Sequence, residues 1–111
     1  MELPPPNFQR DIEEIVAVNR AWKASQELIG LETNMTRSFR DLKGYLQVKL
    51  LKQYSPTWVY LEIDEQADSD EPLYGLKLVH QIGDYTNAEH LPIRVAQAVF
   101  TLDEIQRFTK E

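Results

Sequence analysis

The sequence predicts an α+β domain: a long amphipathic helix, an antiparallel β-meander of three to four strands, and a short C-terminal helix. Three patterns predict it: helical apolar spacing at about 8–29, two alternating runs around an acidic connector, and a helix-capping signature at Thr101. Strands joined by turns, with helices at both ends, are typical of this class. At 111 residues the chain fits one domain, 7–111, after a proline-rich lead-in, 1–6, that we expect to be flexible.

The first helix is predicted from Phe8 to about Ile29, because its apolar residues fall on one face and Gly30 follows as a terminator. Six positions on this face alternate spacings of three and four residues, as in the seam of a coiled coil: Ile12, Ile15, Asn19, Trp22, Gln26 and Ile29. Two of the six are polar. The pattern leaves two interpretations open, an ordinary core helix and a helix that dimerises along this seam.

Residues 36–54 allow either a strand or a helix. The run Tyr45–Tyr54 alternates, with Leu46, Val48 and Leu50 on one side, which predicts a strand after a short helix that stops by Gly44. The alternative is one helix running through Gly44, at a cost of about 1 kcal/mol relative to alanine. Its apolar stripe would be Phe39, Leu42, Leu46 and Leu50. We take the strand as the prediction.

Two alternating runs, Trp58–Asp64 and Leu73–Val79, predict an antiparallel hairpin around the connector Glu65–Pro72. One face is apolar and is expected to lie in the core; it carries Val59, Leu61, Ile63, Tyr74, Leu76 and Leu78. The other face carries Trp58 and Tyr60 with Lys77. Tyr and Trp are enriched in protein interfaces, so this second face is a candidate for binding a partner. The alternative is that the long helix covers it within the chain.

The C-terminal third begins with residues 83–92, which are polar and bounded by glycine and proline, and this predicts a loop. The following run, Ile93–Phe100, alternates and predicts a last strand. Thr101 and Glu104 then form the capping box of a helix at about 102–110, with a buried stripe of Leu102, Ile105 and Phe108.

The net charge of −6 is concentrated in one segment. Six acids and no base lie between Glu62 and Glu71, and the remaining 12 acids match the 12 bases. Because no basic stripe is left to neutralise phosphates, we expect neither nucleic-acid nor membrane-surface binding. The chain has no cysteine, no apolar run near ~20 residues and no signal-peptide pattern at its start, so the expected location is the cytoplasm.

No pattern in the chain indicates catalysis, a cofactor or a metal. The acidic connector lacks the alternating ligands and central glycine of a calcium loop. His80 and His90 have no metal-site spacing, and no serine lies in a nucleophile context. We therefore expect a protein that is not an enzyme.

The predicted function is a cytosolic protein–protein interaction module, such as an adaptor, assembly factor or regulator. We expect it to bind another protein, with a basic surface, through a sheet face or edge and the acidic loop, and to form a homodimer through the N-terminal helix or an edge strand. The predicted contact residues are Trp58, Tyr60, Tyr74, Lys77, Asp64, Asp68, Asp70 and Glu71.

Two other functions stay open. An immunity protein or antitoxin would use the same acids to mask a basic enzyme site. A small-molecule-binding or enzymatic α+β domain would need a pocket between helix and sheet where polar groups converge, such as His80, Tyr85 or Arg94.

Overall fold

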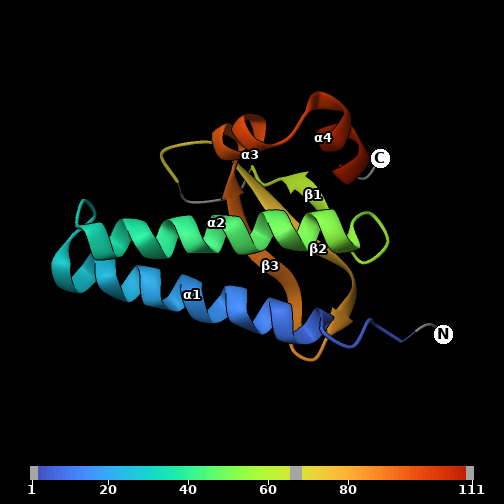
Figure 1. The fold of residues 1–111 in the computed structure, drawn as a ribbon, viewed down its shortest axis with the longest axis horizontal. Helices are drawn as coiled ribbons and strands as arrows, with labels where there is room; N and C mark the ends of the chain where they lie inside the picture. Colours follow the sequence, from blue (N-terminus) through green and yellow to red (C-terminus); the bar gives the residue numbers. More distant parts are fainter. Residues whose placement is uncertain (1–2, 66–68, 110–111) are drawn as a thin grey trace.

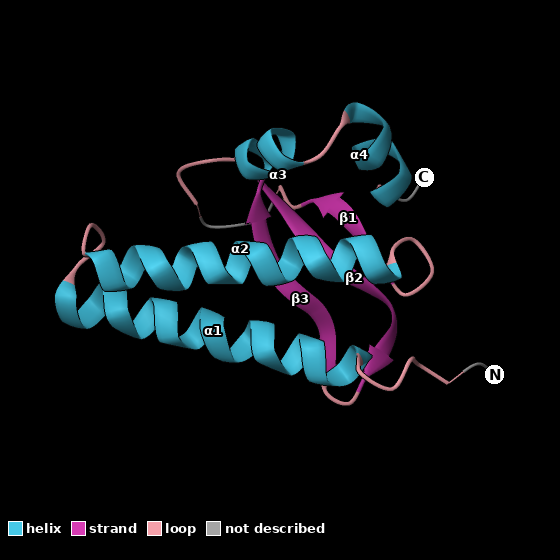
Figure 2. Cartoon of the chain, viewed as in Figure 1, coloured by secondary structure: helices cyan, strands magenta, loops and turns pink. Residues whose placement is uncertain are grey.

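A computed structural model describes residues 3–65 and 69–109 and confirms the α+β class. Two long helices, α1 (Phe8–Ile29) and α2 (Asn34–Tyr54), form an antiparallel hairpin over one face of a sheet (Figure 1). The sheet is an antiparallel meander of β1 (Val59–Ile63), β2 (Leu73–Ile82) and β3 (Tyr85–Pro92), with β2 in the centre. Two short helices, α3 (Ile93–Val99) and α4 (Leu102–Phe108), lie at one end of the sheet (Figure 2).

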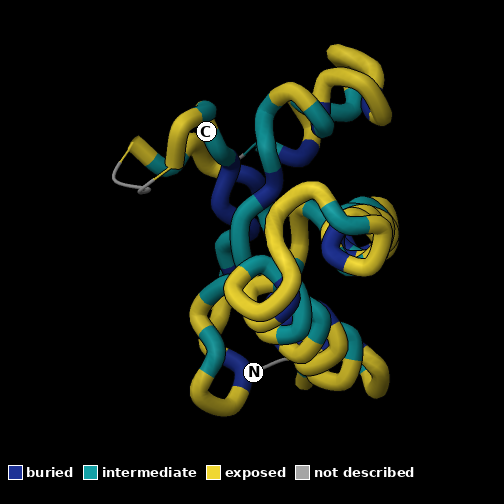
Figure 3. The backbone as a smooth tube through the Cα atoms, turned by 90° about the vertical axis from the view of Figure 1, so that its left-hand side faces the viewer, coloured by how far each residue is buried: buried dark blue, intermediate teal, exposed yellow. Residues whose placement is uncertain are grey.

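The core lies between the sheet and one half of the α1–α2 hairpin, the half that contains the start of α1 and the end of α2. Apolar side chains at most 1% exposed come from α1, α2, all three strands and the two short helices: Phe8, Ile12, Ile15, Leu50, Leu51, Val59, Leu61, Leu76, Ala88, Leu91, Ala96 and Phe108. Burying each large aliphatic or aromatic side chain contributes roughly 1.5–3 kcal/mol. Figure 3 shows buried residues in the strands as well as in the helices. The predicted core face of the β1–β2 hairpin is therefore confirmed except at Ile63, which ends β1 and is 56% exposed.

Helix α1 has the predicted bounds. Gly30 ends it with a φ of 97°, and its amide donates to the carbonyl of Gln26. The residues of the predicted seam that are buried, Ile12, Ile15 and Asn19, belong to a helix that packs extensively on α2. The heptad-like spacing thus describes a helix pair formed within the chain.

The predicted strand at 45–54 is wrong, because α2 continues through Gly44 to Tyr54. Thr33 begins the helix by accepting a hydrogen bond from the amide of Thr36, at 3.2 Å. Buried positions along α2 follow a helical period: Thr36, Lys43, Gln47, Leu50 and Leu51. Three of these, Thr36, Lys43 and Gln47, are polar. Packing against α1 and the sheet outweighs the helix penalty of Gly44.

Two further predictions near the C-terminus are wrong. The expected loop at 83–92 is mostly strand β3, which follows a two-residue turn in which Gly83 has a φ of 58°. The expected strand Ile93–Phe100 is helix α3, which begins directly after Pro92. Its buried Ala96 follows Ile93 by three residues, a helical spacing that the alternating pattern concealed.

The capping box at the last helix is confirmed, but the predicted buried stripe is wrong at Leu102, which is 77% exposed. The hydroxyl of Thr101 accepts from the amide of Glu104, and the Glu104 carboxylate accepts from the amide of Thr101. Helix α4 runs over Leu102–Phe108, and the predicted end at residue 110 lies outside the described residues.

Both edges of the sheet are partly covered by side chains or main chain. On β3, the buried amide of Gln47 donates to the carbonyls of Ala88 (3.0 Å) and His90 (3.1 Å). Glu89, between them, has a φ of 68°, and the β2–β3 register shifts at this point. On β1, Leu61 forms a parallel bridge with Thr109. Edges blunted in this way offer fewer main-chain groups to a neighbouring strand.

Candidate interaction surfaces

The side of the sheet that faces away from α1 and α2 carries two rows of aligned residues. In the first row, Tyr60 of β1 lies opposite Lys77 of β2, which lies opposite Asn87 of β3. In the second row, Gly75 lies between Glu62 and His90. We call this surface the polar face; it consists of Tyr60, Glu62, Asp64, Lys77, Asn87 and His90.

A hydrogen-bonded pair joins the two outer strands across the second row. The Nε2 atom of His90 lies 2.6 Å from Oδ2 of Asp64, the residue that follows β1, and the two side chains are 38% and 20% exposed. Asp64 also begins the segment that leads into the acidic connector. The pair therefore fixes the start of the connector against the polar face.

Gly75 makes room for Lys77 on the same face. A Cβ atom at Gly75 would lie 3.1 Å from Cε and 3.6 Å from Nζ of Lys77. The lysine side chain therefore lies over the glycine, next to the row that holds Glu62 and His90. This arrangement places a cation, an imidazole and carboxylates side by side, a set suited to hydrogen bonds and ion pairs with a protein surface.

The structure brings together three of the predicted contact residues, Tyr60, Asp64 and Lys77, and separates two others from them. Tyr74 is 8% exposed and belongs to the core cluster on the helix side of the sheet. The ring of Trp58 meets that of Phe8 in α1 at 6.0 Å and packs against the core. Neither side chain lies on the polar face.

The acidic connector supplies the remaining predicted contacts. Asp70 is exposed, whereas Glu71 lies 3.4 Å from the guanidinium of Arg94 in α3. Asp68 lies outside the described residues. His90 and Asn87 were not predicted, because both fall in the segment expected to be a loop. The Gly83–Asp84 pair between two apolar positions is the turn signal that identifies β3.

A second candidate surface, also not predicted, lies on the outside of the helical hairpin. Most large apolar side chains that are strongly exposed fall between residues 28 and 45: Leu28, Ile29, Leu31, Met35, Leu42 and Tyr45. Between the helices in the same part of the hairpin, the buried residues are polar: Asn19, Ser25, Thr36 and Lys43. This half of the hairpin is therefore polar inside and apolar outside, the reverse of an isolated helix pair.

Hydrogen bonds and one cation–π contact hold this polar interior together. The hydroxyls of Ser25 and Thr36 are 2.6 Å apart, and Thr36 also donates to the carbonyl of Gly30. The ammonium of Lys43 lies 4.8 Å from the centre of the Trp22 ring. Burial lowers the pKa of Lys43 to about 8, and the nearby carboxylate of Glu89 opposes that shift only in part.

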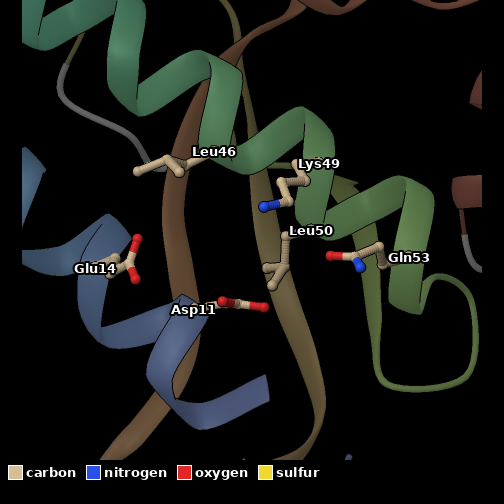
Figure 4. Close-up of a pocket in the computed structure, with 6 residues that line it drawn as sticks. All are labelled: Asp11, Glu14, Leu46, Lys49, Leu50 and Gln53. Atoms are coloured by element: carbon tan, nitrogen blue, oxygen red, sulfur yellow. The ribbon is translucent and has the colours of Figure 1, made fainter. Parts of the chain in front are cut away.

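A shallow hollow of about 70 Å³ opens between α1 and α2 nearer the core. Figure 4 shows its side chains meeting between the two helices, with the strands behind them. Asp11 and Glu14 come from α1, and the other four come from α2: Leu46, Lys49, Leu50 and Gln53. One wall of the hollow is therefore acidic, and the other carries a cation.

The residues proposed for a small-molecule pocket do not converge. Tyr85 begins β3 whereas Arg94 lies beyond its other end, and His80 contacts the ring of Trp58. A second depression, lined by Glu71, Pro72, Ile93, Arg94 and Gln97, is open and lies at the end of the sheet. Over residues 3–65 and 69–109, no three histidine or acidic side chains are grouped to hold a metal ion. Within those same ranges, none of the helices is long and apolar enough to cross a membrane.

No known protein family, curated protein or solved structure matches this chain. What it does is therefore inferred from its own surfaces.

Proposed function

We propose that this chain is a protein–protein interaction module that binds a partner with a basic surface through the polar face and the adjoining acidic connector. The observation that carries the proposal is the one-sided covering of the sheet. The hairpin lies on one face, and the other presents Tyr60, Lys77 and the joined pair of Asp64 and His90. Because these side chains project from paired strands, they are pre-organised, which lowers the entropy lost on binding.

Charge supports a basic partner. Lys77 is the one lysine or arginine of the polar face, which also holds Glu62 and Asp64. The connector that follows adds acids and no base up to Glu71. A surface with this excess of carboxylates attracts a basic surface at long range and speeds encounter.

Loss of one aromatic side chain from the polar face is expected to weaken binding. With the tagged chain as bait in an extract of its source organism, and quantification by mass spectrometry, Tyr60→Ser should reduce recovery of the partner at least ~10-fold, because interface tyrosines often contribute this much. Tyr45→Ser is the matched control, since Tyr45 is an exposed tyrosine of α2, the helix pair on the opposite side of the sheet. Equal recovery with both variants would argue against the polar face.

Salt and charge variants test the electrostatic part separately. Raising ionic strength from about 0.1 to 0.5 M shortens the Debye length from ~10 Å to roughly 4 Å, so association should slow markedly. Asp70→Asn with Glu71→Gln should slow it in the same direction, whereas Asp103→Asn on α4 should leave it unchanged. Association kinetics that do not depend on salt would remove the basic partner from the proposal.

The concentration of acids favours one narrower version, an immunity protein or antitoxin whose partner is an enzyme with a basic site. In that case the captured partner loses activity when the chain binds. Replacing Asp68, Asp70 and Glu71 with their amides should restore activity in proportion to the loss of binding. A partner whose activity is unaffected by saturating chain would be incompatible with this version.

A further inference from the structure

Beyond the hollow between α1 and α2, the same faces of the two helices carry apolar side chains. Side chains three, four, seven or eleven positions apart lie on one face of a helix. On α2, the positions in register with Leu46 of the hollow are Leu42, Phe39 and Met35; on α1, those in register with Glu14 are Val18 and Ala21. We call these six residues the outer groove: Val18, Ala21, Met35, Phe39, Leu42 and Leu46.

The outer groove is only half covered by the chain itself. Met35 and Leu42 are 58% and 44% exposed, and the other four side chains are partly buried. The helices below them are joined through Ser25, Thr36 and Lys43, so this end of the hairpin buries little apolar surface between its own helices. The chain's own helices leave Met35 and Leu42 uncovered on this face, where a protein partner can cover them.

The charges at the end of the groove indicate what covers it. The α1 wall ends in Asp11 and Glu14, and the α2 wall ends in Lys49. A surface with an acidic wall and a basic wall on either side of an apolar groove complements itself when turned about an axis along the groove. The acidic wall of each copy then meets the basic wall of the other.

We propose that a second copy of this chain covers the outer groove, hairpin on hairpin, and forms an antiparallel four-helix bundle with a two-fold axis along the hairpin. Each α1 then lies over α2 of the second copy, and the helical turns at Gly30 lie at the same end of the bundle. The outer grooves form the apolar centre, and Glu14 of each copy approaches Lys49 of the other. The alternative two-fold axis, across the hairpin, would place α1 on α1 and reverse one hairpin end to end, so Glu14 would not face Lys49 of the second copy.

This dimer is independent of the partner-binding surface. The helices occupy its centre, so the two polar faces point outward on opposite sides. Each dimer would present two equivalent partner sites, which raises avidity toward a partner with repeated sites.

The oligomeric state of the full chain tests the proposal first. We expect a dimer by light scattering and sedimentation. The protein concentration should be about 100 µM, because a dimer dissociates by mass action on dilution. Leu42→Glu places a charge in the groove and should give a monomer with an unchanged far-UV circular dichroism spectrum. Leu102→Glu, at a leucine of α4 that is 77% exposed, against 44% for Leu42, should remain a dimer. A monomeric wild type, or a dimeric Leu42→Glu, would overturn the proposal.

Mixing two charge variants tests the geometry. Glu14→Lys alone places Lys against Lys49 of the second copy, and Lys49→Glu alone places Glu against Glu14, so each should dissociate about tenfold more readily. An equimolar mixture should restore dimerisation, because the heterodimer again pairs opposite charges at both contacts. If the mixture is no more dimeric than the separate variants, α1 does not lie over α2 of the second copy.

Discussion

Replacing Gln47 with methionine lowers the free energy of unfolding by about 2–3 kcal/mol. The Gln47 amide is 1% exposed and donates to two carbonyls on the outer edge of β3, those of Ala88 and His90. Methionine keeps the volume and flexibility of the side chain but cannot donate a hydrogen bond. Two main-chain acceptors then lose their partner, and the one at Ala88 is buried, where desolvation is not compensated.

Urea unfolding followed by circular dichroism measures this loss. Gln53→Met is the matched control, because Gln53 lies on the same helix, is exposed and should change stability by less than about 0.5 kcal/mol. Hydrogen exchange in β3 should also quicken in Gln47→Met. A loss as small as that of the control would show that Gln47 does not hold the edge of β3.

Replacing Lys43 with methionine raises the free energy of unfolding at pH 7 by about 1–2 kcal/mol. Lys43 is 9% exposed, and burial lowers its pKa from the ordinary 10.5 to about 8. A fall of that size corresponds to roughly 3 kcal/mol of desolvation cost for the charged amine. The cation–π contact with Trp22 offsets about 1 kcal/mol of it, and methionine also packs favourably on an aromatic ring.

The sign of the pH dependence separates this cause from simple packing. The folded pKa of about 8 lies below the unfolded value of 10.5, so the unfolded chain binds more protons between these limits. The penalty is fully present below pH 8 and disappears as the pH rises toward 10.5. The advantage of Lys43→Met should therefore shrink over this window in paired unfolding curves. A variant that is less stable at pH 7, or an advantage independent of pH, would contradict a charged, buried Lys43.

Short-range sequence patterns predict correctly the elements that form through contacts between residues close in the sequence. Helix α1, the β1–β2 hairpin and the capping box at Thr101 each follow from spacing within a few turns or across one connector. The strand predicted at residues 45–54 is wrong because Leu46, Val48 and Leu50 satisfy both an alternating and a partly helical pattern. The residues that decide for the helix, Lys43 and Gln47, are polar. Their burial depends on Trp22 and on carbonyls 41 and 43 residues away.

The candidate surfaces, too, could be predicted from the sequence only in part. Alternation along β1 and β2 placed Tyr60 and Lys77 on one face, opposite the core. Asn87 and His90 are three residues apart and share that face because the β2–β3 register shifts between them near Glu89, whose φ of 68° is unusual for a residue with a side chain. The outer groove was hidden because its α2 half, from Met35 to Leu46, spans the segment divided between a short helix and a strand.

A chemical-shift footprint on the isotope-labelled chain locates the partner surface residue by residue. The captured partner is purified and added at increasing ratio, and amide shifts are followed by NMR. The largest shifts are expected at Tyr60, Lys77, Asn87 and His90 and in the connector at Asp70, with amides along α1 little changed. A footprint confined to α1 and α2, with the three strands unperturbed, would contradict partner binding at the polar face.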